Sequence, residues 1–248
     1  MVGVIFTKIS RPKKRAATIL WGHKAVICQR DGVMSMLFRV GDMRRTHIVE
    51  AHVRGVLVQR HVTQEGEVID MQQTELDFGF DTGRDRVFLI WPMELQHKIT
   101  PESPFWSMGP NDFSADNATF EVFIFFEGIV EATGMTTQAR CSYTPGEILW
   151  GHRFEQLVTY ESQGHEYLVD LDKFHSTRCI DDDDCADEDD VRFPQVSARR
   201  LHRIRNKRKE SDRQFKKQRR KSSLAATTTA AAAAAAMTTT SGDNAANE

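Results

Sequence analysis

Two short apolar runs joined by an Asp-Gly pair occupy residues 25–40, and they constrain the fold more than any other part of the sequence. The run AVICQR leads into Asp31 and Gly32, and the run VMSMLFRV follows. Asp-Gly between two such runs favours a type I′ turn, whose twist matches that of two antiparallel strands. The sequence therefore predicts a β-hairpin at this position.

Further runs of β type continue as far as residue 171. Alternation between residues 48 and 58 predicts a half-buried strand, with one face formed by Val49, Ala51, Val53 and Leu57 and the other by Glu50, His52 and Arg54. Other strands are expected at 87–90, at 119–127 up to an interruption by Gly128, at 147–160 and at 165–171. No long amphipathic helix is expected before residue 195. Many short strands separated by Gly and Pro turns predict an all-β sandwich.

The charge of the chain is unevenly distributed, although its formal total is only -2. Residues 181–190 contain eight acidic residues and no basic residue, whereas residues 191–221 contain 14 basic and two acidic residues. We expect the acidic run to be a disordered linker, because it repels itself and has little to bury. The basic segment is rich in helix formers from residue 198 to 221, which predicts a solvated basic helix. The Ala/Thr-rich end is assigned no fold.

Several classes of protein are disfavoured by what the sequence lacks. No run approaches the roughly 20 apolar residues that span a bilayer, and the apolar start at residues 1–6 is too short for a signal peptide. The four cysteines form no C-x-x-C pair, so reduced thiols are expected and a zinc site is not. No catalytic signature such as H-E-x-x-H, a P-loop or G-x-S-x-G is present, so we do not expect an enzyme.

A cluster of basic residues directly follows the apolar start, in the segment KISRPKKR at residues 8–15. This order is typical of the cytoplasmic end of a membrane helix, where lysine and arginine attract anionic lipid at about 1 kcal/mol each. A solvated charge run or a nuclear-import signal would have the same composition. The cluster alone leaves these readings open.

Six segments of the chain resemble the cytoplasmic domain of inward-rectifier potassium channels, in that family's order and spacing. They are RPKKRA (11–16), FRVGDMRRTHIVEAHVR (38–54), FDTGRDRVFL (80–89), SPFW (103–106), EGIVEATGMTTQARCSY (127–143) and EILWGHRF (147–154). The resemblance covers residues 1 to about 180. It implies an immunoglobulin-like β-sandwich, four copies of which surround a cytoplasmic pore at the plasma membrane, and it places the chain among voltage-gated channels.

The resemblance also assigns roles to individual residues. It implies that magnesium and polyamines, which block the pore and cause rectification, are attracted by Glu50, Asp81, Asp85 and Glu127. Arg84 departs from that acidic pattern. A cytoplasmic gate loop is implied at Gly128, Ile129, Gly134 and Met135, braced by an ion pair between Glu131 and Arg140. Phosphatidylinositol 4,5-bisphosphate, the activating ligand, is expected at Lys8, Arg11, Lys13, Lys14, Arg44, Arg45 and Arg54. A sodium ion is expected at Asp42 and His47, because the backbone and carboxylate oxygens that such a site requires suit a hard cation.

The expected organisation has five parts. Residues 1–15 form the end of an inner membrane helix and the lipid-binding linker, 16–180 the sandwich, 181–190 the acidic linker, 191–221 the basic tail and 222–248 the low-complexity tail. No cofactor is expected. The expected partners are inward-rectifier subunits, in a homo- or heterotetramer, and anionic lipid. Since no filter or membrane helix is present, we expect a fragment, a truncated isoform or an incomplete gene product.

The alternative is a soluble binding protein that is not a channel. Its basic tail would engage nucleic acid through phosphate contacts, or an anionic membrane. Nucleic acid is not favoured, because Phe215 is the only aromatic residue between 199 and 221 that could stack on a base.

Overall fold

A computed structural model describes residues 15–44, 46–79, 86–115, 119–162, 164–180, 193–211, 213 and 216. The chain divides into two compact units, Met1–Arg199 and Arg200–Glu248. All strands found among the described residues lie in the first unit. Residues 198–211 are helical, and from residue 200 they belong to the second unit, so the helical prediction for the basic tail is confirmed there. Among the residues described, no helix is long and apolar enough to cross a bilayer.

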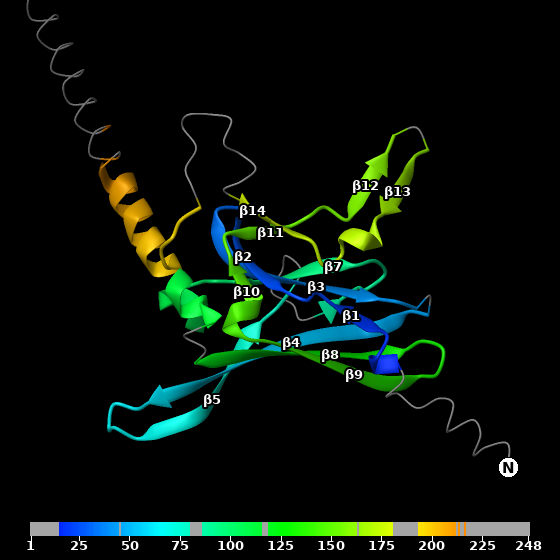
Figure 1. Cartoon of the computed structure of the whole chain (residues 1–248), viewed down its shortest axis with the longest axis horizontal. Helices are drawn as coiled ribbons and strands as arrows, with labels where there is room; N and C mark the ends of the chain where they lie inside the picture. The colour runs from blue at the N-terminus through cyan, green and yellow to red at the C-terminus, as the bar shows by residue number, and fades with distance from the viewer. Residues whose placement is uncertain are drawn as a thin grey trace, which may run out of the picture. The chain divides into compact units, whose positions relative to one another are not determined.

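Two five-stranded sheets form the sandwich (Figure 1). Sheet A consists of β1 (Ile19–Trp21), β2 (Ala25–Arg30), β3 (Val33–Asp42), β7 (Met93–Lys98) and β10 (Ile148–Trp150). Sheet B consists of β4 (Ile48–Val62), β5 (Val68–Asp77), β6 (Arg86–Val87), β8 (Phe120–Val130) and β9 (Met135–Tyr143). All pairs are antiparallel except β2 with β10. The predicted all-β sandwich is confirmed.

Smaller elements complete the first unit. Two-stranded sheets pair β11 (His152–Phe154) with β14 (Thr177–Cys179), and β12 (Val158–Glu161) with β13 (Glu166–Val169). The short 3-10 helices are η1 (Pro104–Ser107), η2 (Pro110–Phe113), η4 (Pro145–Glu147) and η5 (Leu171–Lys173). Of the strand expected at 87–90, only Val87 lies in a strand, and the region 147–160 is divided among three strands.

The predicted hairpin at residues 25–40 is present. Asp31 and Gly32 both have positive φ angles, 52° and 75°, and Arg30 pairs with Val33 across the turn. These angles define the type I′ turn that Asp-Gly favours. The hairpin supplies much of the core, since the aromatic ring of Phe38 is fully buried and meets Phe78 edge-on at 5.0 Å.

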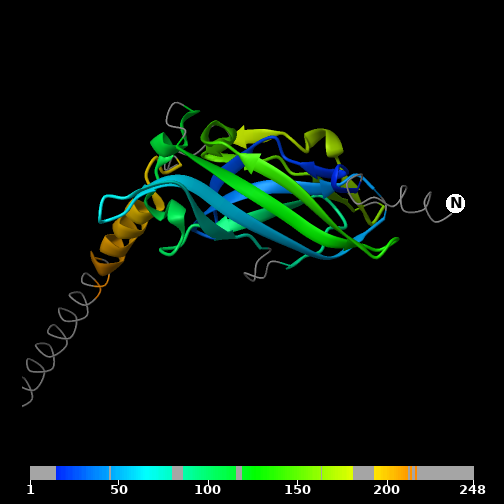
Figure 2. The same ribbon diagram turned by 90° about the horizontal axis from the view of Figure 1, so that it is seen from below.

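Strand β4 contains a β-bulge that shifts its alternation. Val49 pairs with Ile129 and His52 pairs with Glu127, so Glu50 and Ala51 lie opposite the single residue Gly128. The prediction that Val49 faces the core is therefore wrong: its side chain is 40% exposed. Its neighbour Ile48 is buried instead. Beyond the bulge, β4, β8 and β9 run side by side along the sandwich (Figure 2).

Gly128 does not end β8, contrary to the sequence prediction. The strand continues to Val130. A Cβ atom at position 128 would lie 2.4 Å from Cγ2 of Ile48 and 3.2 Å from Cα of Ala51. The glycine therefore allows the bulge of β4 to pack closely against β8.

Candidate functional site

Two of the four predicted cation-attracting acids lie at the same end of sheet B. Glu50 stands in the bulge with a φ of 49°, an unusual left-handed conformation for a residue other than glycine. Glu127 lies on β8, directly before Gly128, which the bulge faces. Both side chains are exposed. Asp81 and Asp85 lie outside the described residues.

Glu127 belongs to a row of polar side chains that crosses sheet B. His52 pairs with Arg86 on one side and with Glu127 on the other, and Glu127 pairs with Gln138. Directly paired residues share a face of a sheet. The amide of Gln138 donates a hydrogen bond of 2.5 Å to Oε1 of Glu127. The bond orients this carboxylate but leaves it exposed, and an exposed carboxylate can attract cations from solution.

The next row of the same face is basic. Arg54 pairs with Phe125, which pairs with Arg140 on the far side, so two guanidinium groups flank one ring. The guanidinium carbon of Arg54 lies 5.6 Å from the ring centroid of Phe125, within the range of a cation–π contact. Of the residues expected to bind phosphoinositide, Arg54 thus lies within sheet B and Arg44 lies in the turn after β3. Lys8, Arg11, Lys13, Lys14 and Arg45 are outside the described residues.

The predicted gate loop is a tight turn between β8 and β9. Gly128 and Ile129 are still in β8, and Met135 begins β9. Gly134 has a φ of 64°, and its backbone N–H donates to the carbonyl of Val130 over 2.8 Å. Open space surrounds the position that a Cβ atom would occupy at Gly134. Glycine is therefore favoured here by the positive φ angle and not by a lack of room for a side chain.

Glu131 and Arg140 are not brought together. Glu131 lies in the turn, where its N–H donates to the carbonyl of His47 over 3.2 Å. Arg140 lies five residues beyond Met135 on β9, opposite Phe125. Between these two residues, both of which are described, no ion pair forms within the chain. The turn is instead fastened by its backbone to the connection between β3 and β4.

Asp42, expected to bind sodium, is engaged by Arg15. Both carboxylate oxygens accept hydrogen bonds from this guanidinium, one of them over 2.7 Å, and each side chain is only 7% exposed. Arg15 also donates to the carbonyl of Thr46 over 2.6 Å. His47 is exposed. Nowhere among the described residues do three or more His, Cys, Asp or Glu side chains gather to hold a metal.

A buried charge network around Arg39 was not predicted from the sequence. Arg39 is 1% exposed, and its guanidinium donates to Oε1 of Glu94 at 3.0 Å and to the carbonyls of Glu155, Lys173 and Phe174. Glu94 also pairs with Arg30. Burial lowers the pKa of Arg39, while Glu94 opposes that shift. The sequence did contain one indication of this network, because Arg39 is a charged residue within the otherwise apolar run VMSMLFRV.

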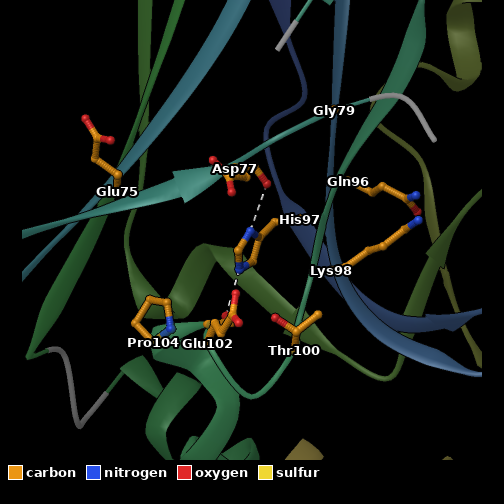
Figure 3. A pocket seen from close by; sticks show the side chains of 10 residues that line it. Glu75, Asp77, Gly79, Gln96, His97, Lys98, Thr100, Glu102 and Pro104 are labelled. Carbon is orange, nitrogen blue, oxygen red and sulfur yellow. Dashed lines mark hydrogen bonds between the residues drawn. The ribbon is translucent and has the colours of Figure 1, made fainter. Parts of the chain in front are cut away.

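The cavity in Figure 3 lies where β5, β7 and the start of η1 meet, and its volume is about 230 Å³. Glu75, Asp77 and Glu102 line it together with His97. Nδ1 of His97 lies 2.9 Å from the carbonyl oxygen of Asp77, and Nε2 lies 2.7 Å from Oγ of Ser103. Burial lowers the pKa of His97. Because both ring nitrogens are engaged, this histidine fastens β7 to its neighbours.

These features define a β-sandwich with exposed acidic and basic rows on one sheet, and comparison with known proteins identifies its family. The profile described as "Inward rectifier potassium channel C-terminal domain" matches residues 19–195. The chain belongs to this family. It is 49% identical over 177 residues to "Inward rectifier potassium channel 4" of Mesocricetus auratus and of Homo sapiens. It is 48% identical over the same length to "ATP-sensitive inward rectifier potassium channel 12" of Gallus gallus.

The match is partial in both directions. It covers 71% of this chain, and 39% to 40% of the length of these relatives. The relatives are described as inward rectifiers, so the expectation of a voltage-gated channel is wrong.

Proposed function

We propose that this chain is the cytoplasmic pore and gating domain of an inward-rectifier potassium channel at the plasma membrane. Four copies, identical or mixed with related subunits, would surround a pore that continues the membrane pore. The outer face of sheet B would line this pore near Glu50 and Glu127. The observation that supports the proposal is the exposure of these two acids at one end of a sheet, Glu50 within the bulge of β4 and Glu127 on the neighbouring strand β8.

Rectification would follow from the charge of these acids. Repeated by fourfold symmetry, together with Asp81 and Asp85, they would raise the local concentration of magnesium and polyamines. An outward driving force would push these cations into the conduction path, where they block potassium. Voltage would therefore act on the blocking cation and would need no voltage-sensing helix in the protein.

A chimera with the membrane part of a related channel tests this role. The double variant Glu50→Gln and Glu127→Gln should require higher concentrations of spermine and magnesium for block, with weaker voltage dependence, while potassium selectivity persists because it belongs to the filter. The matched control is Glu161→Gln with Glu166→Gln, which removes two exposed acids from the β12–β13 hairpin. Unchanged block in a double variant that opens normally would show that Glu50 and Glu127 do not line the pore.

We also propose that phosphatidylinositol 4,5-bisphosphate activates the channel through Lys8, Arg11, Lys13 and Lys14, with Arg44, Arg45 and Arg54 in support. Arg15 directly follows Lys14, the last residue of this basic cluster. Its guanidinium donates hydrogen bonds to the carboxylate of Asp42 and to the carbonyl of Thr46. This anchor would couple a cluster held at the membrane to the end of β3 and the start of β4. Sodium could bind Asp42 only if Arg15 released the carboxylate, so sodium and the anchor would compete.

Vesicle binding tests the lipid site. Changing Lys8, Arg11, Lys13 and Lys14 to Gln should weaken binding to vesicles that contain the phosphoinositide and reduce its dependence on salt. Deletion of residues 199–221 is the control, because this basic tail would attract the same lipid. If only the deletion weakens binding, the tail is the lipid site and the cluster is not.

A further inference from the structure

Two histidines that are 152 residues apart in the chain stack on each other beside sheet A. His23 lies in the turn between β1 and β2, and His175 lies between η5 and β14. Their ring centroids are 3.6 Å apart and their planes differ by 4°. The backbone N–H of His23 donates to Nδ1 of His175 over 3.3 Å. The stack therefore joins the turn after β1 to the segment that directly precedes β14.

The hydrogen bond defines the protonation state of His175. Since Nδ1 accepts from a backbone N–H, it carries no proton, and the neutral ring holds its proton on Nε2. An added proton would go to Nδ1, where it would abolish this bond. It would also place a cation face to face with a second imidazole.

The surroundings of His175 oppose such a proton. Burial lowers the pKa of His175 most, and the nearby charges of His23 and Arg39 lower it further. Phe174 meets its ring edge-on at 5.0 Å and offers no charge. Next to His23 in the chain, the ammonium group of Lys24 donates to the carbonyl of Gly146, and its charge helps to lower the pKa of Glu147.

Besides the pairing of β14 with β11 and the hydrogen bond from the N–H of Glu155 to the carbonyl of Ser176, the segment 171–179 is held beside sheet A at two points of different chemistry. At the first, Arg39 binds the carbonyls of Lys173 and Phe174 at 2.9 and 3.2 Å, and the ring of Phe174 is buried against Gly41. An arginine stays charged throughout the physiological range. The second point is the histidine stack, which can lose its attraction when a proton binds.

We propose that the His23–His175 stack is an acid-sensitive latch for residues 171–179. At neutral pH the ring of His175 is uncharged and the latch is closed. Uptake of a proton by His175 opens it, which frees the stretch between η5 and β14 from the turn between β1 and β2. Arg39 and the pairing of β14 with β11 keep the rest of the segment in place.

The direction of the pH dependence follows from linkage. The closed latch lowers the pKa of His175, so the open form binds the proton more tightly. The latch is therefore fully effective above the ordinary imidazole pKa of about 6.5, and it weakens as the pH falls below that value.

Hydrogen exchange of the full chain between about pH 7.5 and about pH 5.5, which brackets the ordinary imidazole value, tests the latch. After correction for intrinsic exchange, amide protection in residues 171–179 should fall by up to about tenfold per pH unit, the limit for uptake of one proton. The variant His175→Phe keeps an aromatic ring in the stack without a titrating group, so its protection should not depend on pH. The control His61→Phe, at an exposed position of β4, should behave as the wild type.

Protection of residues 171–179 that is independent of pH in the wild type, or that changes equally in His175→Phe, would overturn the proposal. If His175→Phe does not fold, NMR titration of the wild-type imidazoles decides. A pKa of His175 at or above the ordinary value would refute the latch, and a lower value, with exchange of this segment rising in step with the titration, would support it.

Discussion

Sheet A and sheet B differ in where they keep their charged side chains. In and directly before sheet A, Arg39 is 1% exposed and Arg15 and Asp42 are 7% exposed. Each arginine donates to a carboxylate and to carbonyl groups, and Asp42 accepts from Arg15. In sheet B, Glu50, Arg54, Glu127 and Arg140 are all exposed. A buried charge must be matched by partners if the fold is to be stable, whereas an exposed charge keeps its field available to ions outside the protein. The first group therefore serves folding, and the second is available for function.

The strongest test of this difference is the variant Arg39→Met. It removes hydrogen bonds to three carbonyl groups and a carboxylate, and it leaves those groups with fewer partners. Breaking a buried ion pair in this way costs about 3–5 kcal/mol of unfolding free energy. Urea unfolding of the full chain measures the loss. A variant that is as stable as the wild type would show that the network contributes nothing to the fold.

Two glycines of sheet B test whether its backbone is as constrained as the core of sheet A. Gly128→Ala would push a Cβ atom against Ile48 and the backbone of Ala51, and overpacking of this kind costs about 1–3 kcal/mol. Gly134→Ala meets no atom, but it places alanine at a φ of 64°, at a cost of about 1 kcal/mol.

Thermal unfolding of the two glycine variants should therefore rank Gly128→Ala below Gly134→Ala. The reverse order would mean that the bulge of β4 yields more easily than the turn. In that case Glu50 would not be held in a defined position.

The sequence predicted the sandwich well, because period-two alternation and the Asp-Gly turn at residues 31–32 are local signals. It failed at the bulge, since the extra residue in β4 is revealed only when Gly128 on β8 is seen opposite it. It failed at Arg39 for a similar reason: the partners that make its burial tolerable come from residues 94, 155, 173 and 174. Resemblance to the family implied an ion pair between Glu131 and Arg140, and within one chain the register places Arg140 opposite Phe125 while Glu131 lies in the turn. The hydrophobic pattern of a single sequence does not reveal which residues of distant strands lie opposite each other.

Acid should weaken the sandwich through His97, which is buried next to β5. Its pKa is lowered by burial, so the unfolded chain binds the proton more tightly than the folded one. The stabilisation is complete above about pH 6.5 and is lost as the pH falls, by at most about 1.4 kcal/mol per pH unit for one proton. In His97→Asn the urea midpoint should depend less on pH between about pH 6.5 and pH 5, below the ordinary imidazole value. An equal dependence in both proteins would assign the acid sensitivity to other groups.

The smallest effect on stability is expected where the effect on function is expected to be largest. Glu50→Gln and Glu127→Gln keep the shape of each side chain and remove its charge, and an amide oxygen at position 127 can still accept from Gln138. Because both side chains are exposed, the unfolding free energy should change by less than about 0.5 kcal/mol. Repulsion between the two acids at one end of sheet B could even make the variants slightly more stable at low salt, with the difference disappearing as salt screens it. Urea unfolding at low and high salt measures both quantities. If the unfolding free energy fell by several kcal/mol, these carboxylates would be required for folding, as Arg39 is expected to be. Any change in cation block would then have to be attributed to a damaged fold.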